Sequence, residues 1–297
     1  MDLQLLDTFK AVVEEGSFSA AGQRLLRTQP AISLALKRLE AELGEMLIDR
    51  SSKSVVLTDS GKAVYEYAKR FDGLKSELRN RLVELRDKRT GSLTIGANES
   101  TALYLLRHIE AYRALYPGVK VEIRRSLSSR MPAAVLDGSL ELGAISYDPE
   151  DPKLITEVIY NDSLEFIVSP KHRFAGRKHV SITELGMESF IAHNVVSPYR
   201  KNVVDAFRRH NVVLDMKLEL PTIETIRRMV QANLGVTFMP KMCVEAEIAS
   251  GTLVEVPVNE IKMERQINLI YAAKRQLSHA AQAFLELIHS GNAKRTV

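Results

Sequence analysis

Apolar residues near the start of the chain recur at helical spacing. Ala20, Ala21 and Leu25 predict the buried face of a helix of about two turns. Ser17 or Ser19 is expected to cap its N-terminus, because a serine hydroxyl accepts a hydrogen bond from one of the first free backbone N–H groups. The apolar pattern then stops, so this helix is predicted to be short.

A second helix is predicted immediately after the first. Thr28 is its expected N-cap and Pro30 lies in its first turn, where a missing N–H costs nothing. Two helices with apolar stripes and so short a turn between them must cross steeply, which lets the second enter the major groove of DNA N-terminus first. The apolar stripe and the glycine that ends this helix are Ile32, Leu36, Leu39, Leu43 and Gly44.

The other face of the second helix is polar and basic. Gln29, Ser33 and Lys37 lie away from the apolar stripe and are expected to face base edges, whereas Thr28 and Arg38 are expected to contact phosphate. Residues 16–39 include no acidic residue, although the whole chain holds 41 Lys and Arg against 37 Asp and Glu. Such local charge is typical of a DNA footprint. Taken alone, the pattern fits an ordinary helical hairpin with a solvated basic face equally well.

Two strand-like runs follow, and after them comes one long helix. Residues 47–50 and 55–57 predict a hairpin wing, from which Arg50 and Lys53 would reach the DNA backbone or the minor groove. Thr58 is expected to cap a helix that continues to about residue 88, which is about 45 Å long. A narrow apolar stripe on so charged a helix predicts pairing with the same helix of a second copy; packing on the chain's own second domain is the alternative. The stripe consists of Val64, Tyr67, Phe71, Leu74, Leu78, Leu82 and Leu85.

The order of these segments resembles the N-terminal region of LysR-type transcriptional regulators. The resemblance covers residues 1 to about 89 and is carried by FSAAGQRL, TQPAISLALKRLEAELG, LIDR, VVLTDSG and the long helix. It implies a winged helix-turn-helix over 1–58, a dimerisation helix over 59–89, and DNA contacts that include Arg27, Pro30 and Leu34. The chain departs from the family at Leu34, where a polar or basic residue is frequent, and at Ile48, where an aromatic residue is usual. Leu34 is expected to change base preference.

The remaining part, residues 90–297, alternates strand and helix patterns and predicts an α/β domain. Strands are expected over 92–96, 119–125 and 140–146, with helices over 102–116 and around 130–137. The unit VEIRRSLSSRMPAAVLDGSLELGAIS recurs in outline as KLELPTIETIRRMVQANLGVTFMP, which predicts two similar lobes with a cleft between them.

The LysR-type effector domain resembles periplasmic binding proteins in fold, and this half of the chain fits it. The resemblance implies one lobe over about 91–161 and 267–290 and the other over 162–266, with crossings near Asp162 and Ile267. It also points to effector contacts at Ser100, Thr101, Ser128, Ser129, His193, Asn194 and Thr222. Each of the hydroxyl residues can equally be a simple helix cap. Helix N-termini and Arg130 suit an organic acid or an amino-acid-like effector, whereas Glu99 is an unusual neighbour for an anion and can instead hold an amine.

Other chemistry is not indicated. Cys243 is the only cysteine, so no intramolecular disulfide switch is expected, and the seven His residues show no metal-ligand spacing. Neither a cofactor motif nor a catalytic motif is present, and an enzyme using Lys171 or His193 is the distant alternative. The N-terminus does not resemble a signal peptide, which predicts a cytoplasmic protein without a membrane partner. We expect promoter DNA and a small effector as partners of a dimer that assembles into a tetramer. The other alternative is a small-molecule binding protein without DNA reading.

Overall fold

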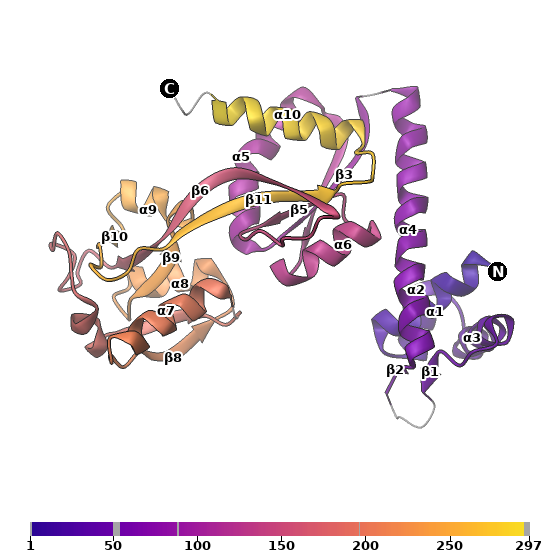
Figure 1. Cartoon of the computed structure of the whole chain (residues 1–297), viewed down its shortest axis with the longest axis horizontal. Helices are drawn as coiled ribbons and strands as arrows, with labels where there is room; N and C mark the ends of the chain where they lie inside the picture. Colours follow the sequence, from indigo (N-terminus) through magenta and orange to yellow (C-terminus); the bar gives the residue numbers. More distant parts are fainter. Residues whose placement is uncertain (1, 50–53, 88, 196, 294–297) are drawn as a thin grey trace.

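The computed structural model describes residues 2–49, 54–87, 89–195 and 197–293. They form a small helical head, one long helix and an α/β domain of two lobes (Figure 1). The predicted fold class is thus confirmed. Arg50 and Lys53, which were predicted to contact DNA from the wing, lie outside the described residues.

The head contains α1 (Leu3–Glu15), α2 (Phe18–Leu25) and α3 (Gln29–Leu43). The predicted caps are confirmed: the Ser17 and Thr28 hydroxyls accept backbone hydrogen bonds at the starts of α2 and α3, and Gly44 ends α3 with a φ of 73°. Strands β1 (Ile48–Asp49) and β2 (Val56–Leu57) pair antiparallel as the wing. One core joins all three helices to the wing, and its fully buried members include Phe9, Ile32, Leu39 and Leu47.

Helix α4 (Asp59–Arg86) leads from the head along the side of the α/β domain (Figure 1). The Thr58 hydroxyl accepts a hydrogen bond from the Gly61 N–H at 2.9 Å, as predicted for the helix start. A different face of α4 from the predicted apolar stripe packs on the α/β domain, through Lys69, Gly73, Asn80 and Glu84. The stripe from Leu74 onward remains exposed.

Lobe I is built on the parallel strands β3 (Thr90–Ala97), β4 (Gly118–Arg125) and β5 (Leu142–Ile145), with β3 in the middle. Helices α5 (Glu99–Leu115) and α10 (His279–Ala293) share a core with the sheet in which Tyr104, Tyr112 and Phe284 are fully buried. Helix α6 (Met131–Asp137), preceded by a 3-10 turn over Ser128–Arg130, packs on a separate small core.

Two strands cross from lobe I to lobe II. Strand β6 (Leu154–Val168) pairs with β11 (Glu264–Ala272) up to Ser163, and from Leu164 onward it pairs with β9 (Thr237–Pro240) and β10 (Val254–Glu255). Strand β11 continues the sheet to β5. Strand β6 therefore belongs to the sheets of both lobes, and the segment around Ser163 and Leu164, where it changes partners, sets the relative position of the lobes.

Lobe II surrounds a core rich in phenylalanine, including Phe166, Phe174, Phe190 and Phe207. Its other elements are β7 (Ser189–His193), α7 (Pro198–Arg209), β8 (Asp215–Leu220), α8 (Ile223–Gln231), α9 (Glu245–Ala249) and the 3-10 turns Ile182–Met187 and Lys241–Cys243. The two predicted strand–helix–strand repeats are present as β4–α6–β5 and β8–α8–β9. In the described residues, no helix is both long and apolar enough to cross a membrane.

Candidate functional site

The predicted recognition surface is the exposed face of α3. Ile32, Leu36 and Leu39 are buried in the head, so the opposite side of the helix faces outward. The predicted DNA-contacting residues at this face are exposed, except that Ser33 is half-buried: Arg27, Thr28, Gln29, Pro30, Leu34, Lys37 and Arg38. The apolar Leu34 is 51% exposed at a place where a DNA-reading helix meets base edges.

Close packing at Gly22 sets the turn before α3. A Cβ at this position would lie 2.7 Å from the Arg27 carbonyl oxygen, so a larger residue would push the turn away from α2. The basic residues beside the turn differ in their partners. Arg24 pairs with Glu14 and Glu15 at 2.7 and 3.1 Å, whereas Lys37 and Arg38 form no ion pair with any described residue. The positive charge available to DNA therefore lies on α3 rather than on α2.

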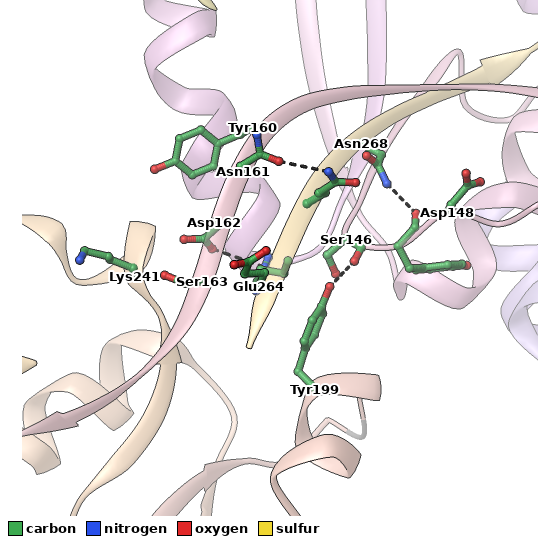
Figure 2. A pocket seen from close by; sticks show the side chains of 13 residues that line it. Ser146, Asp148, Tyr160, Asn161, Asp162, Ser163, Tyr199, Lys241, Glu264 and Asn268 are labelled. Carbon is green, nitrogen blue, oxygen red and sulfur yellow. Dashed lines mark hydrogen bonds and ion pairs between the residues drawn. The ribbon is translucent and has the colours of Figure 1, made fainter. Parts of the chain in front are cut away.

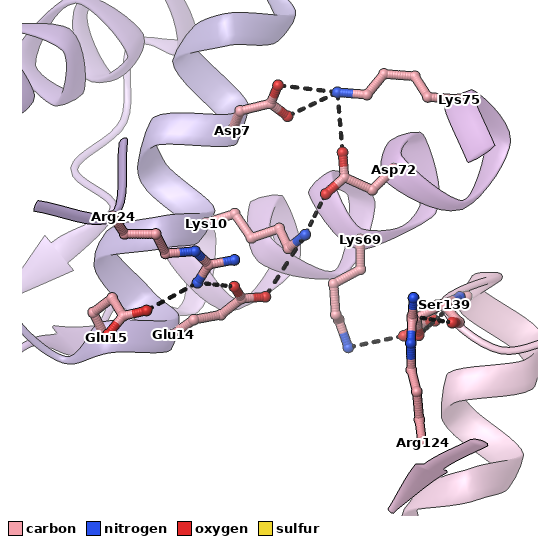
Figure 3. A network of polar contacts seen from close by, with 11 residues as sticks. Asp7, Lys10, Glu14, Glu15, Arg24, Lys69, Asp72, Lys75, Arg124 and Ser139 are labelled. Carbon is pink, nitrogen blue, oxygen red and sulfur yellow. Dashed lines mark hydrogen bonds and ion pairs between the residues drawn. The ribbon is translucent and has the colours of Figure 1, made fainter. Parts of the chain in front are cut away.

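Ion pairs fix the head to α4 (Figure 3). The Lys75 ammonium lies 2.9 Å from Asp7 on α1 and 3.0 Å from Asp72, which also binds Lys10. Burial opposes ionisation of Asp72, but the hydrogen bonds from Lys10 and Lys75 outweigh it and lower the pKa of this carboxyl below 3.8. Because α1 is held by α4, the direction of the recognition helix follows the direction of α4.

The second site is a cavity of about 570 Å³ between the lobes. Figure 2 shows Ser146 and Asp148 beyond the end of β5, Asp162 on β6, and Tyr199 reaching in from α7. The Tyr199 hydroxyl donates to the Ser146 carbonyl oxygen, which ties lobe II to lobe I. The cavity lies where the crossing strands meet both lobes, so a bound molecule there would contact both of them.

A buried ion pair lines the cavity. The Arg265 Nε atom lies 3.4 Å from Asp162 Oδ2, and both side chains are almost fully buried. Arg265 also donates to the Ser100 hydroxyl at 3.2 Å and stacks over the Tyr199 ring at 5.2 Å. Burial raises the pKa of Asp162, and the nearby Arg265 charge opposes that rise. A buried guanidinium beside a ligand-sized cavity is suited to an anionic group.

Three predicted effector residues of lobe I, Ser100, Thr101 and Ser128, are hydrogen-bonded to Asn98. Asn98, rather than Ser100 or Thr101, caps α5, so the helix begins three residues before the predicted start. The Thr101 hydroxyl is buried and binds the Asn98 N–H and the Ala144 carbonyl oxygen, both at 3.0 Å. The Ser128 hydroxyl accepts from the Asn98 amide at 2.8 Å. The Thr101 hydroxyl thus ties the start of α5 to β5, and the Ser100 hydroxyl lies between Asn98 and Arg265.

The lobe II cluster lies against the start of α5. His193 Nε2 is 3.3 Å from the Glu99 carboxylate, and Thr222 caps α8 through a bond from the Thr225 N–H at 3.2 Å. Asn194 is exposed, as are Ser129 and Arg130 of lobe I. Glu99, which precedes Ser100 in the chain, thus contacts both His193 and the start of α8. Ser129, Arg130 and Asn194 lie at the surface.

Arg265, Tyr199 and Asn268 are cavity residues that the sequence did not single out. Arg265 and Asn268 carried a signal, since polar residues at these positions interrupt the apolar run that ends the strand RQINLIYA. Tyr199 carried none, because its partner Ser146 is far away in the sequence.

Cys243 is a buried free cysteine. Burial raises the pKa of the Cys243 thiol to about 12, so it stays protonated and unreactive. Across the described ranges, no group of three His, Cys, Asp or Glu side chains is arranged to hold a metal ion.

Comparison with known proteins identifies the family. The family model for the bacterial regulatory helix-turn-helix protein of the lysR family matches residues 3–62, and that for the LysR substrate binding domain matches residues 86–293. The chain belongs to the LysR family of transcriptional regulators. It is therefore a DNA-binding regulator with an effector-binding domain, and not an enzyme.

Relatives of this LysR-type regulator match it over nearly its full length. A probable RuBisCO transcriptional regulator of Cyanidioschyzon merolae is 32% identical over 292 residues, which are 96% of each chain. A protein of the same description from Cyanophora paradoxa is 31% identical and covers 96% of this chain and 90% of its own.

Two solved structures share the fold. Full-length CbnR in complex with its target DNA has a TM-score of 0.70 at 19% identity and covers 98% of this chain and 99% of its own. The regulatory domain of Synechocystis CcmR, in complex with 2-PG, has a TM-score of 0.60 at 24% identity and covers 67% of this chain and 96% of its own.

Proposed function

We propose that this LysR-type regulator controls promoters by converting effector binding between its lobes into a change in the spacing of two DNA-reading heads. The observation that carries the proposal is the exposed polar and basic face of α3 on a head that α4 holds in place. Gln29, Ser33, Leu34 and Lys37 would read base edges, while Arg27, Thr28, Pro30 and Arg38 would position the helix on the backbone. Arg50 and Lys53 of the wing would extend this contact.

Dimerisation through α4 would supply the second head. Tyr67, Leu74, Leu78, Leu82 and Leu85 are each more than half exposed, and a continuous apolar stripe on a long charged helix is stable when it meets an equivalent stripe. Two such dimers would assemble through their effector domains into a tetramer, in the cytoplasm where promoter DNA lies. We assign residues 1–58, 59–89 and 90–297 to the head, the dimerisation helix and the effector domain.

The effector would be a small organic acid or an amino-acid-like metabolite. The cavity is lined by the Arg265 guanidinium, which also donates to the neighbouring Ser100 hydroxyl, and by acidic groups and amides. The regulatory domain of the related CcmR was solved with 2-PG, which is consistent with a small acidic ligand. Binding would favour one closure of the lobes, and α4 would pass this change to the heads and to the bend of the promoter.

Exchange of Gln29 tests the assignment of the recognition helix. Gln29→Ala removes a potential bidentate contact to adenine, so the affinity for a specific promoter site should fall by about 1 to 3 kcal/mol at fixed salt. Binding to unrelated DNA should stay the same, because phosphate contacts carry no sequence information. The matched control is Gln282→Ala, the same change at an exposed position of α10 in the effector domain. Equal specific affinity of the two variants in electrophoretic or fluorescence assays would contradict the assignment.

A further inference from the structure

A carboxylate of the protein itself occupies the interface between the two polar clusters of the cleft. Glu99 lies in the first turn of α5, in lobe I, and both of its oxygens bind groups of lobe II. Oε1 accepts the backbone N–H of Ile223 at 2.9 Å, and Oε2 lies 3.3 Å from His193 Nε2. No other carboxylate in the described residues bridges the start of α8 and His193.

Both lobe II partners are suited to a negative charge. Ile223 is the first residue of α8, where unpaired N–H groups and the helix dipole favour an anion. His193 Nδ1 accepts the Val195 N–H at 3.1 Å, so its proton is on Nε2 and points to Glu99. The Arg200 guanidinium donates to the backbone carbonyl oxygen of His193 at 3.0 Å. Arg200 is also paired with Glu219.

We propose that Glu99 is a specificity-determining residue of the effector cleft: its carboxylate links the lobes and keeps anionic effector groups away from His193 and α8. This inference rests on the proposed function of the cleft. A second carboxylate or a phosphate within a few ångströms of Glu99 would meet a like charge and would have to displace a group that is held at high effective concentration. The acidic end of an effector is therefore directed to Arg265 and Ser100, and a dianion that spans both positions is rejected.

Chemical rescue tests this role of Glu99 in the full-length protein. Glu99→Ala removes the tethered carboxylate and leaves room for a free one, so the variant should melt at a lower temperature than wild type. Acetate at about five times its Kd should then raise the Tm of Glu99→Ala by roughly 2 to 4 °C relative to sodium chloride of equal ionic strength. Wild type should show no such shift, since its own carboxylate already fills the position.

Two matched variants separate local binding from general salt effects. Glu110→Ala removes an exposed carboxylate from the same helix and should show no acetate-specific rise in Tm. Adding His193→Ala to Glu99→Ala should remove the rescue, because the anion then loses one of its two partners. A rise of equal size in Glu110→Ala, or no rescue of a folded Glu99→Ala, would overturn the proposal.

Glu99→Gln keeps the size of the side chain and gives a second test if Glu99→Ala fails to fold. Removal of one negative charge at contact distance should strengthen binding of the dicarboxylate probe succinate roughly fivefold. Equal affinity of wild type and Glu99→Gln in calorimetry would contradict the proposal. Promoter binding, measured on wild type in parallel, distinguishes the two failures: its absence refutes the proposed regulator, whereas intact DNA binding without these anion effects refutes only the role of Glu99.

Discussion

The two faces of α4 differ in what they contact. One face contacts lobe I from Lys69 to Glu84. Lys69 pairs with Asp137 at 3.1 Å, and the Asn80 side chain makes two hydrogen bonds to the Ser92 backbone. The same face continues through Gly73, Glu77 and Glu84, which contact Gly138, Arg275 and Ala280.

The other face is apolar and has no partner within the described chain. Leu78 and Leu85 are 61% and 71% exposed, and Leu74 and Leu82 on the same side are also more than half exposed. Polar contacts of fixed geometry set where the effector domain sits on α4, whereas an exposed apolar stripe stabilises the molecule only when a second copy covers it. Contacts within the chain thus fix the position of lobe I on α4, whereas the exposed stripe is the surface that we propose a second copy covers.

Charge on the apolar face should have the largest effect. Leu78→Asp buries a carboxylate in the proposed helix pair, so we expect a monomer and a loss of more than about tenfold in promoter affinity, since both heads no longer bind together. Sedimentation velocity and DNA binding measure both results. Ser76→Asp, which adds the same charge to an exposed position on the far side of α4, is the control. An unchanged dimer in Leu78→Asp would show that the stripe serves another purpose.

A larger side chain on the face of α4 that contacts lobe I should have an intermediate effect. A Cβ at Gly73 would lie 2.8 Å from the Asp137 carbonyl oxygen and 2.9 Å from Gly138, both backbone atoms that cannot rotate away. Gly73→Val should therefore move α4 off lobe I and destabilise the protein by about 1 to 3 kcal/mol, with faster proteolysis near residues 87–90. Gly176→Val is the matched control, because no atom lies within 4 Å of a Cβ there. If both variants are equally stable, the contact does not hold the helix.

The smallest effect is expected where α4 meets the head. The Asp72 carboxyl has a lowered pKa in the folded protein, so its ion pairs contribute stability above the unfolded value of 3.8 and lose it as the pH falls through the folded value. Asp72→Asn should reduce stability at pH 6 by less than about 1 kcal/mol, because the pairs are partly solvated. Urea unfolding at pH 6 and pH 3 should show the difference between wild type and variant shrinking in acid. A constant difference would mean that the effect is steric.

The bounds and the exposed face of α3 could be predicted from the sequence, because both depend on one continuous segment. Thr28 and Gly44 define α3 by local capping, and the apolar stripe fixes which side of it faces the solvent. The start of α5 was predicted wrongly because Asn98, Ser100 and Thr101 are all suitable caps, and in the structure Asn98 and Thr101 form a capping box while Thr101 also bonds to the distant Ala144.

The cleft was less accessible to prediction because distant segments build it. The partners of Glu99 are 94 and 124 residues away in the chain, so its position between the lobes cannot be deduced from local pattern. Arg265 is positioned by the pairing of β11 with β6, which places it opposite Asp162. Predicting the position of such cleft residues requires the register of the paired strands, which the residue type alone does not give.

Binding of the purified full-length protein to the DNA beside its own gene tests the central claim most directly. The assay uses unrelated DNA as competitor across a salt series, with footprinting of the bound site. The account predicts saturable binding that survives competitor, a steep fall in affinity with salt from the phosphate contacts, and a protected region longer than one dimer covers. Weak binding that competitor abolishes, with or without small organic acids, would contradict it.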